Sequence, residues 1–296
     1  MDYLQKYGYA PDGETIASKL QSIAANLSDA ESTEVFLRCF SMMDLTTLHS
    51  NDTEASVKAL VEKANGVLTA FEGCPLPASV CVYPNFATVV KENRCSDELH
   101  VTTVAGCFPS SQSYLAVKVL ECRMAVQNGA DEIDIVLALN SFMAGDYESA
   151  SREISEIRAA IDEEAAKYDR TVVLKVILET GLLVTAERIA NASFLAMEAG
   201  ADFIKTSTGK VEVNATPMAA YVMCECIRLY YQATGRKVGF KAAGGISTAK
   251  DALCYYCIAS SVLGKEWLDK RWFRFGVSRL GNSLMSAIEQ KTVNYF

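Results

Sequence analysis

Short runs of β-branched and other apolar residues alternate along the chain with longer stretches in which apolar residues recur every three or four positions. The short runs are typical of buried strands, and the longer stretches are typical of amphipathic helices. Strands are predicted over residues 35–43, 79–83, 100–105, 132–137, 172–178, 202–206, 238–242 and 272–275. Helices are predicted over residues 54–64, 112–128, 147–167, 186–198 and 216–233.

Eight strands, each followed by a helix, predict a (β/α)₈ barrel, a fold of about 250 residues. A doubly wound sheet is the alternative, but it usually carries a glycine-rich first turn, and the chain has neither G-x-G-x-x-G nor a P-loop. No linker or low-complexity tract divides the sequence, so we expect one domain over residues 1–296. Residues 1–34 precede the first predicted strand and are expected to form a helical cap on the barrel.

Composition narrows the class of protein. Half of the residues are hydrophobic and 22% are charged, as in an enzyme with a large core. The net charge of −8 argues against nucleic acid as a partner, because phosphate binding needs a basic surface. We expect no membrane association, since no segment has the roughly 18 apolar residues needed to span a bilayer. The N-terminus lacks the apolar run of a signal peptide, so the cytoplasm is the expected location.

The ten cysteines do not suggest disulfides in a chain of this size. Cys254 and Cys257 form a C-x-x-C within a stretch that reads as a helix, with no second pair at zinc-site spacing. We therefore interpret the cysteines as reduced packing residues.

Two lysines stand at the ends of apolar strands. Lys205 ends the strand within Phe203-Ile204-Lys205, and Lys241 ends the next strand, after Phe240. Functional side chains of a barrel come from these strand ends, so adjacent strands would bring the two ammonium groups within several Å. At about 5 Å and an effective dielectric of ~20, their repulsion is roughly 3 kcal/mol, or about 2 pKa units. One lysine would then have a pKa near ~8 and could attack a carbonyl.

An aspartate accompanies the lysines. Ile133, Ile135 and Leu137 alternate toward the helices, which leaves Asp134 pointing into the barrel. An inward carboxylate can relay protons through water and stabilise a neighbouring ammonium group. A buried ion pair that serves packing alone is the alternative interpretation.

A second group of residues suits an anion. Gly209-Lys210, Gly244-Gly245 and Gly276-Val277-Ser278 all follow predicted strands. Free backbone N–H groups at such turns favour phosphate, and barrel phosphate sites often use the loops after strands seven and eight. Three such turns in register with the lysine strands indicate a phosphate-binding edge.

Taken together, these motifs resemble those of the deoxyribose-phosphate aldolase family of class I aldolases. The resemblance runs from about Phe40 to Ser283, and its matching segments are MDLTTL at 43–48, VCVYP at 80–84, GADEID at 129–134, LKVILET at 174–180, both lysine segments and FG at 275–276. It implies the reversible cleavage of 2-deoxy-D-ribose 5-phosphate into D-glyceraldehyde 3-phosphate and acetaldehyde. It also implies a (β/α)₈ barrel that needs neither a metal nor an organic cofactor.

The resemblance implies roles position by position. Lys205 matches the Schiff-base lysine, Lys241 the lysine that lowers its pKa, and Asp134 the proton-relay aspartate. The remaining matched positions line the sugar-hydroxyl pocket (Asp44, Thr208), lie near the site (Cys81) or form the phosphate site (Gly209, Lys210, Gly244, Gly245, Gly276, Ser278).

The sequence departs from the family pattern in two loops and at its end. Ser247 stands where relatives often have an arginine after the glycine pair, and Arg279 stands where they often have a second serine. We hypothesise that Arg279 contacts the phosphate in place of residue 247. Tyr295 is a candidate for a mobile tyrosine that assists protonation, although Phe296 follows it.

Other interpretations stay open on the sequence. A sugar-phosphate binding protein without catalysis could keep the phosphate loops, and another class I aldolase or a transaldolase could share the lysines. A metal-dependent aldolase is less favoured, because only two histidines, His49 and His100, are present, and both fit structural or solvated positions. The sequence does not fix the oligomeric state and allows a homo-oligomer.

Overall fold

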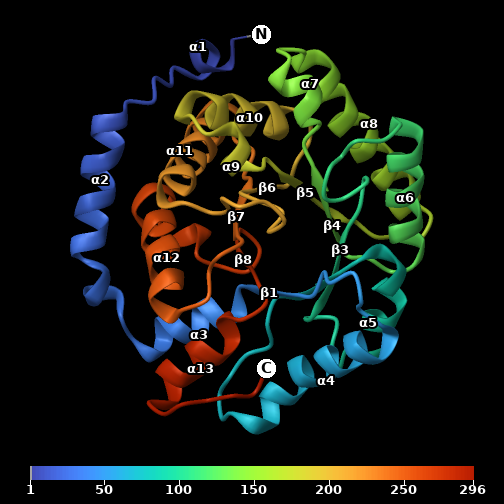
Figure 1. Cartoon of the computed structure of the whole chain (residues 1–296), viewed down its shortest axis with the longest axis vertical. Coiled ribbons are helices and arrows are strands. Elements are labelled where there is room, and N and C mark those ends of the chain that lie inside the picture. The colour runs from blue at the N-terminus through green and yellow to red at the C-terminus, as the bar shows by residue number, and fades with distance from the viewer. Residues whose placement is uncertain (1) are drawn as a thin grey trace.

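The computed structural model describes residues 2–296, and its centre is a closed barrel of eight parallel strands surrounded by helices (Figure 1). The strands pair in sequence order, and β8 closes the barrel against β1. They are β1 (Met43–Thr46), β2 (Ser79–Val82), β3 (His100–Val104), β4 (Glu132–Val136), β5 (Val173–Ile177), β6 (Phe203–Lys205), β7 (Gly239–Ala243) and β8 (Phe273–Val277). The predicted (β/α)₈ barrel is confirmed, and the doubly wound sheet is excluded.

Helices cover the outer face of the barrel. Those before β1 are α1 (Tyr3–Tyr7), α2 (Gly13–Ala25), η1 (Leu27–Ala30) and α3 (Thr33–Ser41). Those that follow the strands are α4 (Glu54–Ala70), η2 (Pro84–Phe86), α5 (Ala87–Asn93), α6 (Leu115–Gln127), α7 (Leu139–Met143), α8 (Tyr147–Ala166), α9 (Thr180–Leu183), α10 (Ala186–Glu198), α11 (Pro217–Thr234), α12 (Ala249–Leu263), η3 (Lys265–Trp267) and α13 (Leu280–Glu289). All five predicted helices are present, with ends shifted by a few residues.

The first predicted strand was wrong. Residues 33–41 form helix α3, which begins after Ser32, whose hydroxyl accepts a hydrogen bond from the backbone N–H of Val35. Phe36, Cys39 and Phe40 are buried at the spacing of one helix face. The true first strand begins only at Met43, where the predicted one ended.

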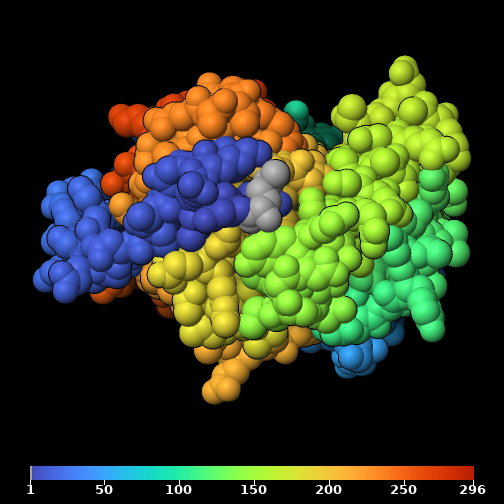
Figure 2. Space-filling model, turned by 90° about the horizontal axis from the view of Figure 1, so that it is seen from above, coloured from blue at the N-terminus to red at the C-terminus, as the bar shows by residue number. Residues whose placement is uncertain are grey.

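The N-terminal helices lie along the outer flank of the barrel. Tyr7 of α1 stacks on Phe194 of α10 at a ring distance of 4.3 Å, and its hydroxyl donates to Glu198 at 2.7 Å. Helix α2 runs beside α11 and α12 (Figure 1), and from above these first helices cover part of the outer helical layer (Figure 2). They therefore add to the outer helical layer of the barrel.

The strands divide the interior into two environments. Outward-facing residues such as Ile133, Ile135 and Leu174 pack under the helices in one large apolar core. The inward-facing positions carry charges in register: Asp134 lies beside Lys175, Lys205 beside Lys241, and Lys241 beside Arg274. The period of two along each strand thus separates an apolar layer from a charged barrel interior.

Candidate active site

Lys205 and Lys241 end adjacent strands and point to the same place inside the barrel. The Nζ of Lys205 lies 2.9 Å from Oδ2 of Asp134, and the Nζ of Lys241 lies 2.7 Å from the same oxygen. All three side chains are at least 96% buried. The predicted approach of the two lysines and the inward direction of Asp134 are therefore both present in the structure.

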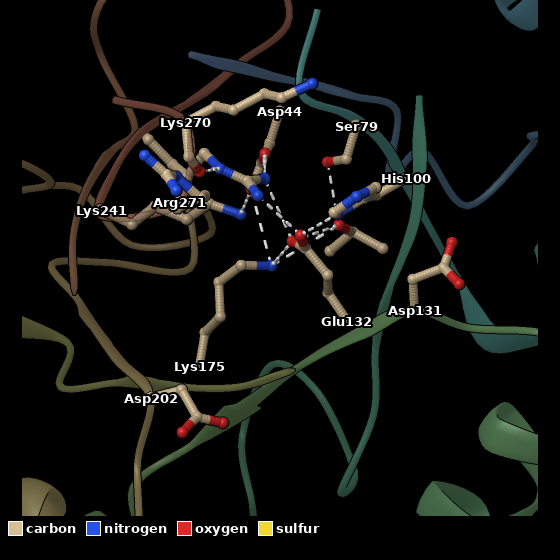
Figure 3. A network of polar contacts seen from close by, with 12 residues as sticks. Asp44, Ser79, His100, Asp131, Glu132, Lys175, Asp202, Lys241, Lys270 and Arg271 are labelled. Carbon is tan, nitrogen blue, oxygen red and sulfur yellow. Dashed lines mark hydrogen bonds and ion pairs between the residues drawn. The ribbon is translucent and has the colours of Figure 1, made fainter. Parts of the chain in front are cut away.

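A third lysine completes the shell of Asp134. Lys175, on β5, donates to Oδ1 of Asp134 at 2.8 Å and lies 2.5 Å from Oε2 of Glu132. Figure 3 shows Lys175 and Glu132 pointing toward each other inside the barrel, with Asp44 and Lys241 nearby. Asp134 thus binds three ammonium groups.

Arg274 joins the remaining two carboxylates. Its Nη1 lies 2.6 Å from Oδ1 of Asp44, and its Nη2 lies 2.6 Å from Oε1 of Glu132. The other oxygen of Asp44 is in contact with Lys241. Asp44, which the resemblance placed at the sugar pocket, lies deeper, among the buried charges.

Sequence reasoning gave no role to Glu132, Lys175 or Arg274. Lys175 and Arg274 carried a signal, because a charged residue between two apolar ones on a buried strand must point away from the apolar layer. Glu132 also lies two positions from Asp134, on the same face of β4. Which of these charges would pair could only come from the barrel's register.

The pKa values in this group move in different directions. Burial lowers the pKa of Lys205 below its ordinary value; Asp134 opposes this change and Lys241 adds to it. Burial acts on Lys241 in the same way, but Asp134 and Asp44 together hold its pKa above the ordinary range. Burial would raise the pKa of Asp134, yet Lys175, Lys205 and Lys241 hold it well below its usual range. Among the three lysines, Lys205 is therefore the one displaced toward the neutral amine.

Cys81 lies beside these charges from β2. Its thiol is fully buried, and burial raises its pKa, while Lys241 and Lys205 act to lower it. It packs with Leu48 and Val104. The structure thus places Cys81 next to the lysines, with its thiol protonated.

A cavity of about 230 Å³ opens over Lys205 at the C-terminal ends of the strands. Every position predicted for the phosphate edge lines it: Gly209, Lys210, Gly244, Gly245, Gly276, Ser278 and Arg279, together with Thr208. Ser247 is not among its lining residues. The loops after β6, β7 and β8 therefore meet around one space, with the amine of Lys205 on its wall.

Backbone conformation and close packing explain why glycine occupies these loop positions. Gly244 and Gly245 adopt φ values of 83° and 81°, which side chains other than glycine seldom tolerate. Gly276 has a different reason, because a Cβ there would lie 3.0 Å from Cε of Lys241 and 2.9 Å from Cβ of Ala243. Gly276 thus makes room for Lys241 as well as lining the cavity.

Thr208 is fixed by a residue that the sequence did not single out. Glu179 is only 2% exposed. Its carboxylate accepts a hydrogen bond from the backbone N–H of Thr208 at 3.1 Å and another from the hydroxyl of Thr208 at 2.5 Å. The Thr208 oxygen in turn accepts from the N–H of Lys210 at 3.0 Å. Because the Thr208 hydroxyl donates its proton to Glu179, it can act only as a hydrogen-bond acceptor toward the cavity.

His49 lies at the rim of the cavity that Lys205 lines, whereas His100 and Tyr295 do not line it. His49 is 69% exposed at the cavity rim, and His100 contacts Glu132 at 2.6 Å. The hydroxyl of Tyr295 donates to the backbone oxygen of Lys63 on α4 at 3.0 Å, so this phenol lies away from the cavity. Within residues 2–296, no three His, Cys, Asp or Glu side chains are grouped to hold a metal ion.

A larger hollow of about 1040 Å³ lies at the opposite end of the barrel, among residues that precede the strands. Its charged residues largely neutralise one another, as Arg38 does with Glu34 at 3.0 Å and Arg271 with Asp269 at 2.7 Å. It holds neither Lys205 nor the glycine loops. We therefore place the candidate active site at the smaller cavity, which Lys205 and the glycine-containing loops line.

All ten cysteines are free, and Cys254 and Cys257 lie on α12, as predicted. Among the described residues, no helix is long and apolar enough to cross a membrane.

Comparison with known proteins gives concordant findings. A family model described as DeoC/LacD family aldolase matches residues 39–262. A Caenorhabditis elegans protein described as "Putative deoxyribose-phosphate aldolase" is 38% identical over 278 residues, covering 91% of this chain and 86% of the relative.

Solved structures agree with the sequence comparisons. A tetrameric deoxyribose phosphate aldolase from Aeropyrum pernix is 25% identical, with a TM-score of 0.65, over 93% of this chain and 98% of that one. A structure titled "QR15, an Aldolase" is 28% identical, with a TM-score of 0.64, over 85% and 95% of the two chains. The family model ends before β8, so Arg274 and Arg279 lie outside the matched segment.

Proposed function

The chain belongs to the DeoC/LacD family of aldolases, and we propose that it reversibly cleaves 2-deoxy-D-ribose 5-phosphate through a Schiff base on Lys205. The observation that carries this proposal is a buried amine, displaced toward its neutral form, on the wall of a cavity rimmed by cationic and glycine-rich loops. Such an amine attacks aldehydes, and such loops bind phosphate.

The reaction begins at the aldehyde carbon of the open-chain sugar. The lone pair of the Lys205 amine forms a bond to C1, which gives a carbinolamine. The C1 hydroxyl then takes a proton from solvent and leaves as water, which produces a cationic iminium. Lys241 keeps its positive charge, but Asp134 and Asp44 lie beside it. Because these carboxylates offset its charge, Lys241 repels the iminium cation only weakly.

Carbon–carbon cleavage follows when the C3 hydroxyl gives up its proton. The C2–C3 bond breaks because acetaldehyde carries C1 and C2: its electron pair moves to the iminium, and C3 becomes the aldehyde of D-glyceraldehyde 3-phosphate. The enamine left on Lys205 takes a proton at C2, and water then releases acetaldehyde and the free amine. Asp134 accepts hydrogen bonds from three ammonium groups, so it passes the C3 proton on through water and does not retain it.

The phosphate end of the substrate fits the opposite wall of the cavity. Lys210 and Arg279 supply positive charge there, and the turn at Gly245 supplies a backbone N–H group. The lone pair of Thr208 suits a sugar hydroxyl as donor. These contacts together favour a short phosphorylated hydroxyaldehyde.

Borohydride trapping tests this function. We expect acetaldehyde followed by borohydride to add one ethyl group to the wild-type protein, located on Lys205 by peptide mass spectrometry. Lys205→Met should form no such adduct and should lose cleavage of the phosphorylated sugar by at least 10³-fold, a loss typical of a missing catalytic group. A wild-type protein that binds the sugar phosphate without forming the adduct would instead be a binding protein.

Two further expectations rest on the family. We expect the enzyme to stay active after treatment with a chelator. A loss of activity would favour a metal-dependent aldolase. A homo-oligomer is also expected, because one relative is tetrameric and helix α6 exposes the apolar side chains of Val117, Leu120 and Met124. Light scattering at several concentrations checks the assembly, and cell fractionation checks the expected cytoplasmic location.

A further inference from the structure

The charges inside the barrel form a closed ring. Six residues alternate in sign around it, each in contact with the next; in order they are Lys241, Asp44, Arg274, Glu132, Lys175 and Asp134, which returns to Lys241. We call this set the charge ring. All six side chains are at least 97% buried, so the pairing takes place away from water.

The charge ring is balanced without Lys205. Each of its three carboxylates contacts at least two of its three cations, and Asp44 also lies 3.7 Å from Lys175, so every ring cation has a carboxylate on both sides. Lys205 is a fourth cation at the same depth. It contacts Asp134, but through an oxygen that already binds Lys241. Lys205 therefore has no carboxylate of its own.

The protonation states of these residues agree with the balance of three carboxylates against three ring cations. The pKa values of Lys175 and Arg274 lie above their ordinary values, since burial lowers them but Asp134, Glu132 and Asp44 raise them by more. The pKa of Glu132 lies well below its ordinary value, because Arg274 and Lys175 outweigh its burial. All of these groups keep their charge, and the only member of the cluster displaced toward neutrality is Lys205.

Few other charges face Lys205. The protonated thiol of Cys81, on β2, lies beside it, and His49, Lys210 and Arg279, which are exposed, line the same cavity. His100 touches the ring only through Glu132. Solvent screens the exposed groups, whereas the buried ring acts on Lys205 at short range.

We propose that Glu132, Lys175 and Arg274 are positioning residues of the aldolase reaction, because the ring that they complete leaves Lys205 as the surplus cation and so selects it as the reacting amine. This inference rests on the proposed function. None of the three lines the cavity, so they act on the substrate only through Lys205 and its neighbours.

This balance of charges predicts that two substitutions, each to glutamine, shift the pH at which Lys205 loses its proton in opposite directions. Lys175→Gln removes a ring cation, so Asp134 becomes available to Lys205, which should keep its proton to higher pH. Glu132→Gln removes a ring carboxylate and leaves a second surplus cation, so Lys205 should lose its proton at lower pH. Each change should move the midpoint of Lys205 reactivity by about one pH unit, or tenfold in free amine at a fixed pH.

A probe that needs no aldehyde measures this midpoint. Acetic anhydride acylates neutral amines, so its rate of reaction with Lys205 across a pH series, read by peptide mass spectrometry, reports the fraction of free amine. Exposed lysines of the same protein provide the internal reference. Circular dichroism and thermal melting establish that each variant is folded before labelling.

The chain offers a matched control and a rescue. Lys118 is also about 2% exposed and is paired to Glu153 at 2.6 Å, but on α6, outside the barrel. Lys118→Gln should lower stability without moving the midpoint. The double variant Glu132→Gln/Lys175→Gln restores the balance and should return the midpoint to its wild-type position. If Lys175→Gln does not fold, Arg274→Gln removes the same charge from the ring.

The result that overturns the proposal is clear. Midpoints that move in the same direction in Glu132→Gln and Lys175→Gln, or no further than in Lys118→Gln, would show that the ring does not select Lys205. A double variant that keeps either single shift would contradict the balance of charges as well. Failure of the proposed function has a separate signature: normal anhydride labelling of wild-type Lys205 without any trapped acetaldehyde adduct.

Discussion

The amine of Lys205 is held between two opposing influences, burial and the carboxylate of Asp134. Burial lowers its pKa most, Asp134 raises it, and repulsion by Lys241 is the smaller contribution to the lowering. The prediction from repulsion alone therefore had the correct direction but not the main cause. The figure of about 2 pKa units counted repulsion alone, without desolvation of the ammonium group or the carboxylates that keep Lys241 charged.

Arg279 offers a test at the level of one side chain. It lines the cavity and Ser247 does not, which supports the hypothesis that the phosphate-binding arginine has moved to the loop after β8. We expect Arg279→Ala to raise KM for the phosphorylated sugar about tenfold, the effect of losing one charge-assisted contact, with little change in kcat.

Steady-state kinetics of Arg279→Ala and Ser247→Ala would measure this difference. The serine variant should behave like wild type, and neither variant should alter the KM of a non-phosphorylated sugar. An unchanged KM for the phosphorylated sugar in Arg279→Ala would refute the hypothesis.

Among the elements, α3 shows how a local pattern can mislead. The run Val35-Phe36-Leu37 is rich in residues that favour strands, but Ser32 caps a helix there and α3 packs against α13 and α12. The other seven strands were located correctly because each is short, apolar and bounded by turn residues.

The C-terminal segment gives a prediction at the scale of an element. Phe296 packs near Phe40 at a ring distance of 6.1 Å, and its N–H donates to Asn282 at 2.9 Å, while Tyr295 is bound to α4. Removing both residues should lower the free energy of unfolding by about 1–3 kcal/mol, the range for losing a partly buried aromatic side chain.

The same truncation should leave the chemistry unchanged. We expect solvent deuterium to enter the methyl group of acetaldehyde at the wild-type rate, because the Tyr295 hydroxyl does not line the cavity. A clear loss of incorporation would show that the tail moves to the active site during turnover.

For the molecule as a whole, the charged interior makes stability depend on pH. Burial would raise the pKa of Asp44, but Lys241, Arg274 and Lys175 lower it from 3.8 to about 2. A carboxyl group with a lowered pKa in the folded state stabilises the protein above its unfolded pKa, and that stabilisation is lost as the pH falls through the folded value. Asp44 thus contributes on the order of 2 kcal/mol above about pH 4.

Urea unfolding at a series of pH values measures this effect. The free energy of unfolding should fall steeply from about pH 4 to about pH 2, and less steeply in Asp44→Asn, which cannot titrate. Equal slopes in the two proteins would show that the buried charges do not couple to folding. A single cooperative transition would also support the prediction of one domain over residues 1–296.

The sequence alone determined the barrel, the places of the two lysines and the aspartate on their strands, and the turns proposed to bind phosphate, because strand periodicity and turn residues are local properties of the chain. Only the tertiary structure decided which charges pair. The charge ring joins residues from β1, β4, β5, β7 and β8, and their contacts depend on the register and closure of the barrel. Register is set by the packing of the whole fold, so the identity of the surplus cation could not be read from any single segment.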